Sequence, residues 1–189
     1  MKAENRKDEI IKTAAKLFKE KGYSAVTMRD LATAMGIKAA SLYNHIKSKQ
    51  EILNEIIISL AEDFTNGMEV IKSSDHESLD KLSQIIALHI KITSQNIYGM
   101  ASLNNDWMHL EDQLNYYQKL RTDYEDNFRA IIKKGIKNNE LLNHNPDVIL
   151  FSMLSTLRSL YIWIPNKEDL NQDELANSLT KVLIKGISV

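Results

Sequence analysis

The sequence predicts an all-α protein of about nine helices, with a small three-helix N-terminal domain and a larger helical domain after it. Three observations support this fold class. Apolar residues recur at helical spacing along most of the 189 residues. No alternation of apolar and polar residues lasts long enough to predict a strand. The two prolines, Pro146 and Pro165, fall where a helix would begin or end. We expect the domain boundary between residues 48 and 49, giving domains 1–48 and 49–189.

The first helix is expected near residues 5–21, with lysines on the side opposite its apolar stripe. That stripe consists of Ile10, Ala14, Leu17 and Phe18. Gly22 ends the helix, and Tyr23 is expected to pack back onto it.

A second and a third helix are expected close together after this turn. Thr27 followed three residues later by Asp30 is a capping-box pattern that starts a helix. Leu31 and Met35 share one face of it, and Gly36 supplies the left-handed residue that ends it. The short segment KAASLYNH then forms a helix of one or two turns, which needs packing to be stable.

A second capping box, formed by Ser48 and Glu51, opens a longer helix. Two short helices joined by a turn that contains glycine, with a longer helix after them, indicate a helix-turn-helix. The second helix of such a motif enters the major groove of DNA. In the segment KAASLYNH, Leu42 and the following Ile46 must point inward.

The remaining side chains of this recognition segment face outward and are candidates for contacts with base edges. Lys38 can donate to guanine and Asn44 to adenine, while alanine methyl groups can contact thymine methyl groups. Arg29, in the first turn of the second helix, is a further donor that reaches the groove. The outward set is Lys38, Ala39, Tyr43 and Asn44, flanked by Ala40 and Ser41.

The charge distribution agrees with a DNA-binding N-terminal domain. The net charge is −1, but residues 1–50 carry +6 and the remainder carries −7. A basic N-terminal part on an acidic body is expected when only the N-terminal part meets phosphate. A basic face that is merely solvated would be an equally good explanation by itself, and the coincidence with a helix-turn-helix favours DNA.

These residues resemble the DNA-binding domain of the TetR family of bacterial regulators over roughly residues 8–55. The matching positions are Ala14, Ala15, Phe18, Gly22, Tyr23, Thr27, Leu31, Ala32, Met35, Gly36, Ile37, Ser41, Leu42, Tyr43, His45, Ser48, Lys49 and Leu53. The sequence departs from the family at Lys38, where Ser or Thr is usual, at Ala40, often Gly, and at Ile46, mostly Phe. The first two departures change the surface that faces the groove, so operator identity does not carry over.

The resemblance implies which side chains hold the DNA backbone. Thr27, Tyr43, His45 and Lys49 match family positions that contact phosphate. Lys49 also lies in the first turn of the long helix, where backbone amides favour an anion. For Tyr43 and His45 the alternative is a half-buried packing role.

After this domain every segment is expected to be helical. The helix that begins at Lys49 runs toward Gly67 or slightly beyond, with a polar loop expected at residues 73–76, and would act as a lever between the two domains. Further helices are predicted over residues 77–95, 97–108, 112–139, 145–163 and 171–186.

The last two helices carry apolar and small residues that suit a four-helix dimer interface, which the family resemblance implies. The candidates are Phe151, Ser152, Ser155, Ser159, Leu175, Leu179, Val182 and Leu183. Packing inside one protomer is the alternative. A homodimer also fits a palindromic operator in double-stranded DNA, because half-sites lie ~34–36 Å apart.

The middle helices are rich in aromatic and methionine side chains, which could line a pocket for a largely apolar effector. The candidates are Phe64, Met68, His89, Tyr98, Met100, Trp107, Tyr117, Tyr124, Phe128 and Arg158. For any single one of them an ordinary core role is favoured, whereas for the region as a whole the family resemblance implies a pocket. The segment from Trp107 to Gly135 has a faint similarity to family members that sense acyl-coenzyme A esters. The identity of the effector stays open.

Several functional classes are not expected. The sequence contains no cysteine and no metal-ligand spacing, so neither a metal nor a cofactor is predicted. No glycine-rich phosphate loop or nucleophile motif predicts an enzyme. No apolar run approaches the ~20 residues of a membrane span, and a cytoplasmic location is expected. The leading hypothesis is a homodimeric repressor released by its effector; the alternative is a DNA-anchored adaptor whose body binds a protein partner.

Overall fold

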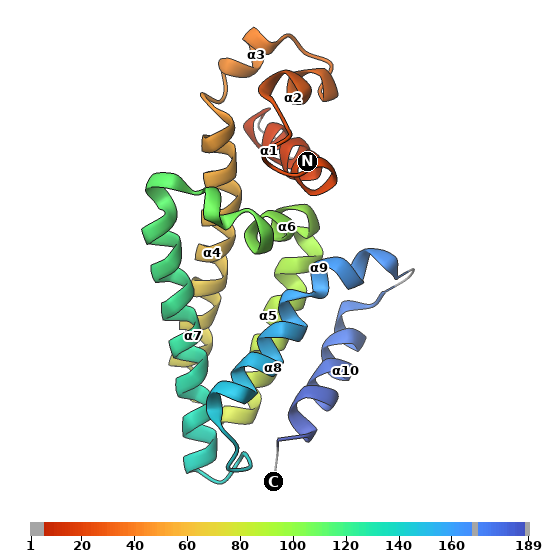
Figure 1. Cartoon of the computed structure of the whole chain (residues 1–189). Coiled ribbons are helices and arrows are strands. Elements are labelled where there is room, and N and C mark those ends of the chain that lie inside the picture. Colours follow the sequence, from red (N-terminus) through yellow and green to blue (C-terminus); the bar gives the residue numbers. More distant parts are fainter. Residues whose placement is uncertain (1–5, 168–169, 188–189) are drawn as a thin grey trace. The chain divides into compact units, whose positions relative to one another are not determined.

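The computed structural model describes residues 6–167 and 170–187, and the regular secondary structure of this part is helical (Figure 1). The α-helices are α1 (Arg6–Lys21), α2 (Met28–Ala34), α3 (Ala39–Tyr43), α4 (Lys49–Ser73), α5 (Ser78–Gln95), α6 (Ile97–Asn105), α7 (Leu114–Lys137), α8 (Pro146–Arg158), α9 (Leu160–Trp163) and α10 (Gln172–Lys185). Short 3₁₀ turns lie at η1 (Trp107–His109), η2 (Glu111–Gln113) and η3 (Ile164–Asn166). The all-α class is confirmed.

The chain forms two compact units. The first unit contains the chain up to Ala61 together with Tyr98–Tyr117, and the second contains Glu62–Ile97 and the chain from Gln118 onward. Helix α4 contributes its N-terminal half to the first unit and its C-terminal half to the second. The segment Tyr98–Tyr117 therefore belongs with the helix-turn-helix, although it lies far from it in sequence.

The core of the first unit follows the predicted pattern. Ile10 and Phe18 of α1, Leu31 of α2 and Leu42 of α3 are buried, as is Ile46 after α3. Both predicted caps form: the Thr27 hydroxyl accepts from the Asp30 amide at 3.2 Å, and the Ser48 hydroxyl accepts from the Glu51 amide at 3.0 Å. Gly36 has the left-handed φ of 64° that ends α2.

Two packing details in this unit were predicted from residue type. Tyr23 is buried with its ring edge against Phe18, at a centroid distance of 5.1 Å, which confirms its predicted packing role. Met35 is the C-cap residue of α2 and only half-buried, so its part in the core is smaller than expected.

In the second unit, α10 packs along α5, and α8 and α9 also contact α5. Helix α4 continues past Gly67 to Ser73, where the predicted polar loop begins. A Cβ at position 67 would lie 2.6 Å from both terminal carbons of Leu88, so glycine allows α4 and α5 to approach closely. The helix predicted over 145–163 is interrupted at Ser159, which separates α8 from α9.

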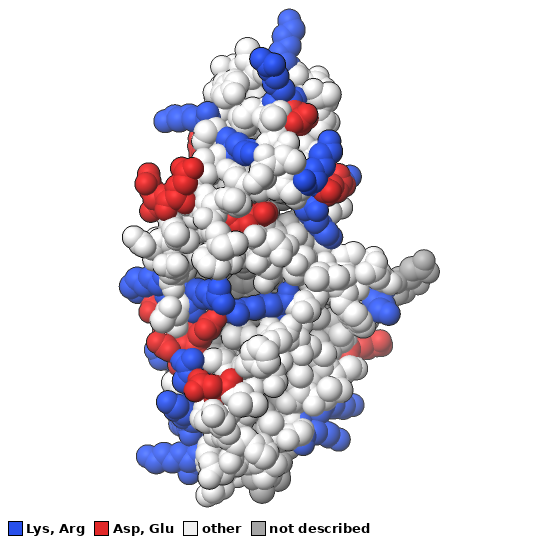
Figure 2. Space-filling model, viewed as in Figure 1, with Lys and Arg blue, Asp and Glu red and all other residues white. Residues whose placement is uncertain are grey.

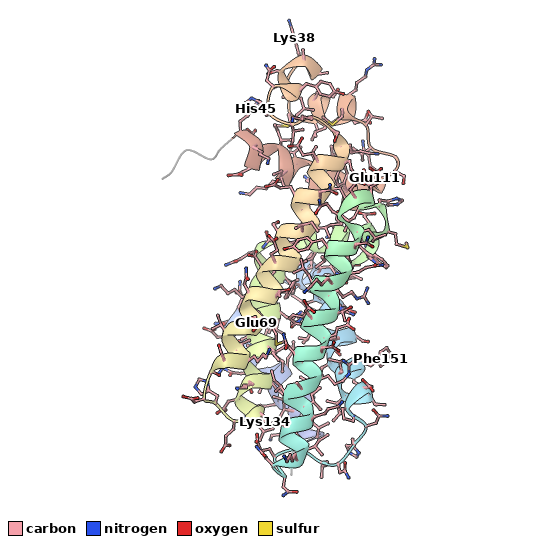
Figure 3. All side chains as sticks on the ribbon, turned by 90° about the vertical axis from the view of Figure 1, so that its left-hand side faces the viewer. Lys38, His45, Glu69, Glu111, Lys134 and Phe151 are labelled. Atoms are coloured by element: carbon pink, nitrogen blue, oxygen red, sulfur yellow. The ribbon has the colours of Figure 1, made fainter. Side chains whose placement is uncertain are left out.

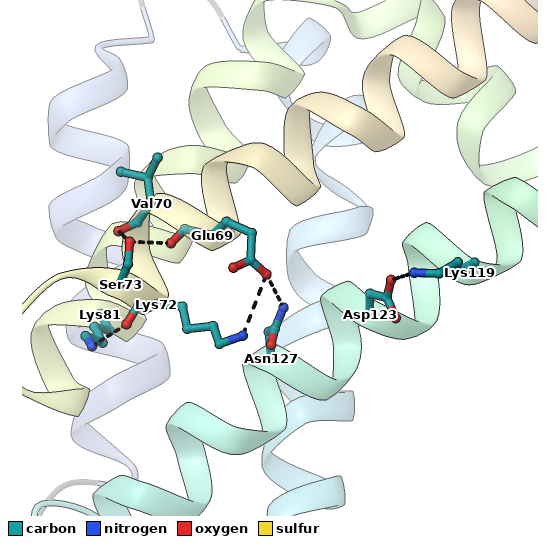
Figure 4. A network of polar contacts seen from close by, with 8 residues as sticks. All are labelled: Glu69, Val70, Lys72, Ser73, Lys81, Lys119, Asp123 and Asn127. Atoms are coloured by element: carbon teal, nitrogen blue, oxygen red, sulfur yellow. Dashed lines mark hydrogen bonds and ion pairs between the residues drawn. The ribbon is translucent and has the colours of Figure 1, made fainter.

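Polar contacts join the helices of this unit at its surface (Figure 4). The Asn127 amide of α7 donates to the Glu69 carboxylate of α4 at 2.8 Å. The ammonium of Lys81, a buried residue of α5, donates to the carbonyl of Lys72 near the end of α4 at 2.9 Å. A cation is favourable there because the last carbonyls of a helix have no helical partner.

Candidate DNA interface and effector site

Helix α3 has an exposed, polar outer face and a buried, apolar inner face that anchors it to the rest of the first unit. Its N-cap residue, Lys38, makes no side-chain cap bond, so the five-residue helix depends on the burial of Leu42 and the adjoining Ile46. The Tyr43 side chain is 52% exposed. Figure 3 shows Lys38 projecting away from the ribbon at the end of this motif, and in Figure 2 several lysine and arginine side chains project from the face shown of that end.

The structure brings most of the predicted DNA-contacting side chains to the surface. Ala39 alone among the base-contact candidates of α3 is half-buried. The exposed candidates are Arg29, Lys38, Ala40, Ser41, Tyr43, Asn44 and His45. Because these side chains are exposed, they are available to contact base edges in a DNA groove or phosphates of the DNA backbone.

Thr27 is exposed but already engaged. Its hydroxyl donates to the Asp30 carboxylate at 2.6 Å while accepting from the Asp30 amide, and its own amide donates to the same carboxylate at 2.8 Å. These two bonds from Thr27 lower the pKa of Asp30. A phosphate contact by the hydroxyl would have to compete with this carboxylate. The predicted phosphate role of Thr27 is therefore better assigned to helix capping.

Lys49, also predicted to contact phosphate, is likewise already bonded within the protein. Its ammonium donates to the carbonyl oxygens of Tyr23 at 2.8 Å and Val26 at 2.9 Å, and it lies 4.3 Å from the centre of the Tyr23 ring. The sequence indicates a cation at the start of α4 but gives no sign that the turn between α1 and α2 supplies its ligands. Lys49 thus joins that turn to α4.

Replacing Lys49 by methionine should lower the free energy of unfolding by ~1–3 kcal/mol, because two carbonyl groups lose their charged donor. The matched control is Lys47→Met, at an exposed lysine two residues earlier. Urea unfolding followed by circular dichroism measures both variants. Equal stability of the two would contradict the structural role of Lys49, and weakened DNA binding at unchanged stability would restore its phosphate role.

A polar link connects the turn after α1 to the segment between α6 and α7. The Tyr23 hydroxyl donates to the side-chain oxygen of Gln50 at 2.8 Å. The Gln50 amide nitrogen donates to the carbonyl of His109 at 2.7 Å and to Asn54 at 3.0 Å. The His109 ring lies 5.3 Å from that of Tyr23. Sequence reasoning missed this link, because its members are up to 86 residues apart.

The ten predicted pocket residues divide between the two units. Four lie in the first unit, where Trp107 stacks on Tyr117 at 5.8 Å and Tyr98 lies beneath the Lys19 ammonium. Met100, the fourth, is buried. The other six lie in the second unit: Phe64, Met68, His89, Tyr124, Phe128 and Arg158.

Four of those six, among them the buried His89, form an aromatic cluster. The His89 ring lies 4.6 Å from the Phe64 ring, and its Nε2 is 2.8 Å from the Tyr124 hydroxyl. Tyr124 in turn packs edge-on against Phe128 at 6.4 Å. Burial, with a smaller contribution from the positive charge of Arg158, lowers the pKa of His89 to about 3. Burial also raises the pKa of Tyr124, so both side chains are neutral at neutral pH.

Some buried polar atoms next to this cluster have no partner in the protein. Among the described residues they include His89 Nδ1 and the hydroxyl of Thr93, one helical turn further along α5. Thr93 is not among the predicted pocket residues. Its position four residues after His89 is the signal that could have identified it.

Arg158 belongs to a half-buried charged group on the same unit. Its guanidinium donates to Glu125 Oε1 at 2.6 Å, and Arg121 donates to the same oxygen at 3.1 Å. Partial burial would raise the pKa of Glu125, but the hydrogen bonds from Arg158 and Arg121 outweigh it and lower the pKa. Two guanidinium groups share one carboxylate, which leaves a local excess of positive charge.

The dimer candidates on α8 and α10 are mostly exposed. Phe151 and Val182 are each 72% exposed, and Phe151 points away from the ribbon in Figure 3. Val148 and Ile162, which the sequence reasoning missed, add exposed apolar surface. Ser152, Ser155 and Ser159 are exposed, and Leu179 and Leu183 are half-buried. Leu175 is buried within its own protomer, which leaves little of its side chain available to the predicted interface.

Within the described part of the chain, no three His, Asp or Glu side chains gather in a way that could hold a metal ion.

Comparison with known proteins identifies the family. Residues 10–56 match the model of the bacterial regulatory proteins of the tetR family, and residues 75–187 match the tetracyclin repressor-like C-terminal domain. A curated relative, the HTH-type transcriptional repressor KstR2 of Rhodococcus jostii strain RHA1, is 23% identical over 186 residues, covering 97% of this chain and 91% of the relative.

Two solved structures have the same fold. The ketosteroid transcriptional regulator KstR2 of Mycobacterium tuberculosis superposes with a TM-score of 0.91 at 19% identity, covering 100% of this chain and 97% of that one. AibR in complex with isovaleryl coenzyme A and operator DNA gives a TM-score of 0.76 at 19% identity, covering 95% and 98%. The C-terminal match alone includes more than half of the sequence. The chain therefore belongs to the TetR family of bacterial regulatory proteins and is a DNA-binding transcriptional regulator.

Proposed function

We propose that the protein is a homodimeric repressor that leaves a palindromic operator when a small, largely apolar effector binds the C-terminal domain. The observation that carries the DNA-binding part is the division of α3 into a buried inner side and an exposed outer side. Leu42 is fully buried, whereas Lys38, Tyr43 and Asn44 are exposed. Residues 1–48 would read the operator, with Tyr43 and His45 on phosphates and Lys38, Asn44 and Arg29 in the groove.

We propose that the exposed apolar side chains of α8 and α10 pack against a second copy of the chain. The stretch Pro146–Asn166 is long and apolar enough to pass for a membrane span by length and composition. It is interrupted at Ser159, however, and it contains two charged residues, Asp147 and Arg158, that form ion pairs with α7. An interface between protomers would cover the apolar side chains while leaving these pairs intact.

The proposed effector combines an apolar body with an anionic group, as an acyl-coenzyme A ester does. The aromatic cluster around His89 offers apolar contacts, and Arg121 and Arg158 offer positive charge beside it. The AibR complex contains isovaleryl coenzyme A together with operator DNA, which makes this effector class a reasonable starting point. Binding must favour a conformation in which the two DNA-binding domains no longer match the half-sites. A cytoplasmic location fits this function.

The DNA-binding proposal is tested by fluorescence anisotropy on the DNA upstream of the protein's own gene. Tyr43→Phe removes one exposed hydroxyl and should weaken binding about fivefold on every sequence, the effect of losing ~1 kcal/mol of hydrogen bonding. Tyr116→Phe, at another exposed tyrosine, is the control. Binding by the unaltered protein that ignores both sequence and salt concentration would refute the proposal.

The effector proposal is tested separately on the preformed complex with DNA. Addition of decanoyl-coenzyme A should release the protein, whereas coenzyme A alone should not, because the thiol form lacks the apolar part. Failure of acyl esters of several chain lengths to release the DNA would remove this effector class. The DNA-binding proposal would stand in that case.

A further inference from the structure

We propose that His89 and Thr93 form a deep hydrogen-bonding subsite that receives an uncharged oxygen, a hydroxyl or carbonyl, at the buried end of an otherwise apolar effector. The inference rests on the proposed function, because it specifies what the effector carries at the end that enters the second unit. Such a subsite would favour an effector whose buried end carries a hydroxyl or carbonyl over one whose buried end is a plain hydrocarbon.

The first step is the arrangement of the two residues on α5. They lie four positions apart, so their side chains leave the same face of the helix one turn apart. His89 is 3% exposed and Thr93 is 0% exposed. His89 Nδ1 and Thr93 Oγ1 both lack a hydrogen-bond partner within the protein. Two unpaired polar atoms therefore occur on successive turns of one buried helix face.

The second step is that neither atom has the partner that is usual for its residue type. A threonine inside a helix commonly donates to the carbonyl four residues earlier. Thr13 does so with Glu9 at 2.8 Å, but Thr93 does not. A buried histidine usually has both ring nitrogens occupied, and here only Nε2 is paired, with Tyr124. Leaving such atoms unpaired among apolar rings is costly, so a partner from outside the protein is expected.

The third step concerns the charge of that partner. His89 is neutral and its free nitrogen is either a donor or an acceptor, depending on which way the Tyr124 hydroxyl bond runs. The threonine hydroxyl can act in both senses. Phe64 and Phe128, which adjoin His89 and Tyr124, carry no charge, and the positive charge of Arg158, which acts on His89, is already paired with the Glu125 carboxylate. An uncharged oxygen matches the pair, whereas a carboxylate buried there would have to compete with Glu125 for Arg158.

The experiment compares two probes that differ by one oxygen at the far end: decanoyl-coenzyme A and 10-hydroxydecanoyl-coenzyme A. Isothermal titration calorimetry measures both on the unaltered chain, on Thr93→Val and on Thr13→Val. Valine keeps the shape of threonine and removes only the hydroxyl. Thr13, whose hydroxyl is bonded within its own helix in the first unit, is the matched control.

We expect Thr93→Val to shift the ratio of the two dissociation constants at least tenfold toward the plain decanoyl ester. The control should keep the ratio of the unaltered chain. Because the Thr93 hydroxyl has no partner to lose, the variant should unfold at the same or a higher temperature, which a structural hydroxyl would not allow. In ¹⁵N-labelled protein, the Nδ1 resonance of His89 should move with the hydroxylated probe and stay in place with the plain one.

An unchanged ratio in Thr93→Val would overturn the subsite, as would failure of the hydroxylated probe to bind. If the plain ester alone binds and releases operator DNA, the subsite is wrong while the proposed function stands. If a water molecule, identified in a crystal structure with the hydroxylated probe, still bridges His89 and Thr93, the subsite is a hydration site and the inference fails. Loss of operator binding by the unaltered chain would instead count against the proposed function itself.

Discussion

Phe151→Asp should convert the protein from a dimer to a monomer and lower its affinity for a full operator by roughly 100-fold or more. Phe151 is 72% exposed on α8, and we assign it, together with the exposed Val148 and Val182, to the interface with a second protomer. A carboxylate in such an interface would have to be buried without a partner. Sedimentation velocity gives the oligomeric state, and anisotropy on full and half operators gives the two affinities.

Val70→Asp is the matched control, because Val70 is 71% exposed on α4, outside α8 and α10. It should remain dimeric and bind the full operator like the unaltered protein. A monomeric Val70→Asp would show that the wrong face has been assigned. If Phe151→Asp were still dimeric at micromolar concentration, the α8–α10 interface would have to be abandoned.

His89→Gln should remove much of the loss of stability that the protein undergoes on acidification. The folded pKa of His89, about 3, lies below its ordinary value of 6.5 because burial disfavours the charged ring. The unfolded chain therefore takes up the proton first as the pH falls. The stability that neutral His89 contributes is present above pH 6.5 and is lost progressively down to about pH 3.

The expected size of this effect is about 1.4 kcal/mol per pH unit within that window, or ~2–3 kcal/mol between pH 6.5 and 4.5. Urea unfolding across this range should give a flatter pH dependence for His89→Gln than for the unaltered protein. The slope is the readout, because the substitution also alters the bond to Tyr124 and so shifts stability at every pH. His144→Gln, at an exposed histidine, is the control. Parallel slopes in all three proteins would show that His89 is not buried in its neutral form.

The parts of the fold that depend on local sequence could be predicted. The capping pair Thr27 and Asp30, the left-handed Gly36 and the spacing of Leu42 and Ile46 each act within a few residues, and the helix-turn-helix follows from them. The function of Gly67 could not be inferred in the same way. Its role depends on Leu88, which α5 brings against it, and nothing in the neighbouring sequence indicates that approach.

The sequence indicated which residue types make up the candidate sites, but it did not indicate which residues they bond to. Lys49 was correctly marked as a cation at a helix start, yet its ligands are carbonyl groups more than twenty residues earlier. His89 was marked as a polar residue among aromatics, but its bond to Tyr124 spans 35 residues. Leu175 fits an outward stripe by spacing and is buried because α10 lies along α5. The comparisons with known regulators do not favour the alternative of a DNA-anchored adaptor whose body binds a protein partner.

The bonds from Gln50 to Tyr23 and to the carbonyl of His109 bear on the construction of chimeric regulators. A DNA-binding domain cut out near residue 56 and grafted onto another sensor would leave the Gln50 amide and one side of the Tyr23 ring without their native neighbours. We expect a transferred DNA-binding domain to fold in a chimera that also includes residues 98–117, and chimeras without these residues to be poorly expressed. The part of this protein that can be transferred as a folded domain is thus discontinuous in sequence.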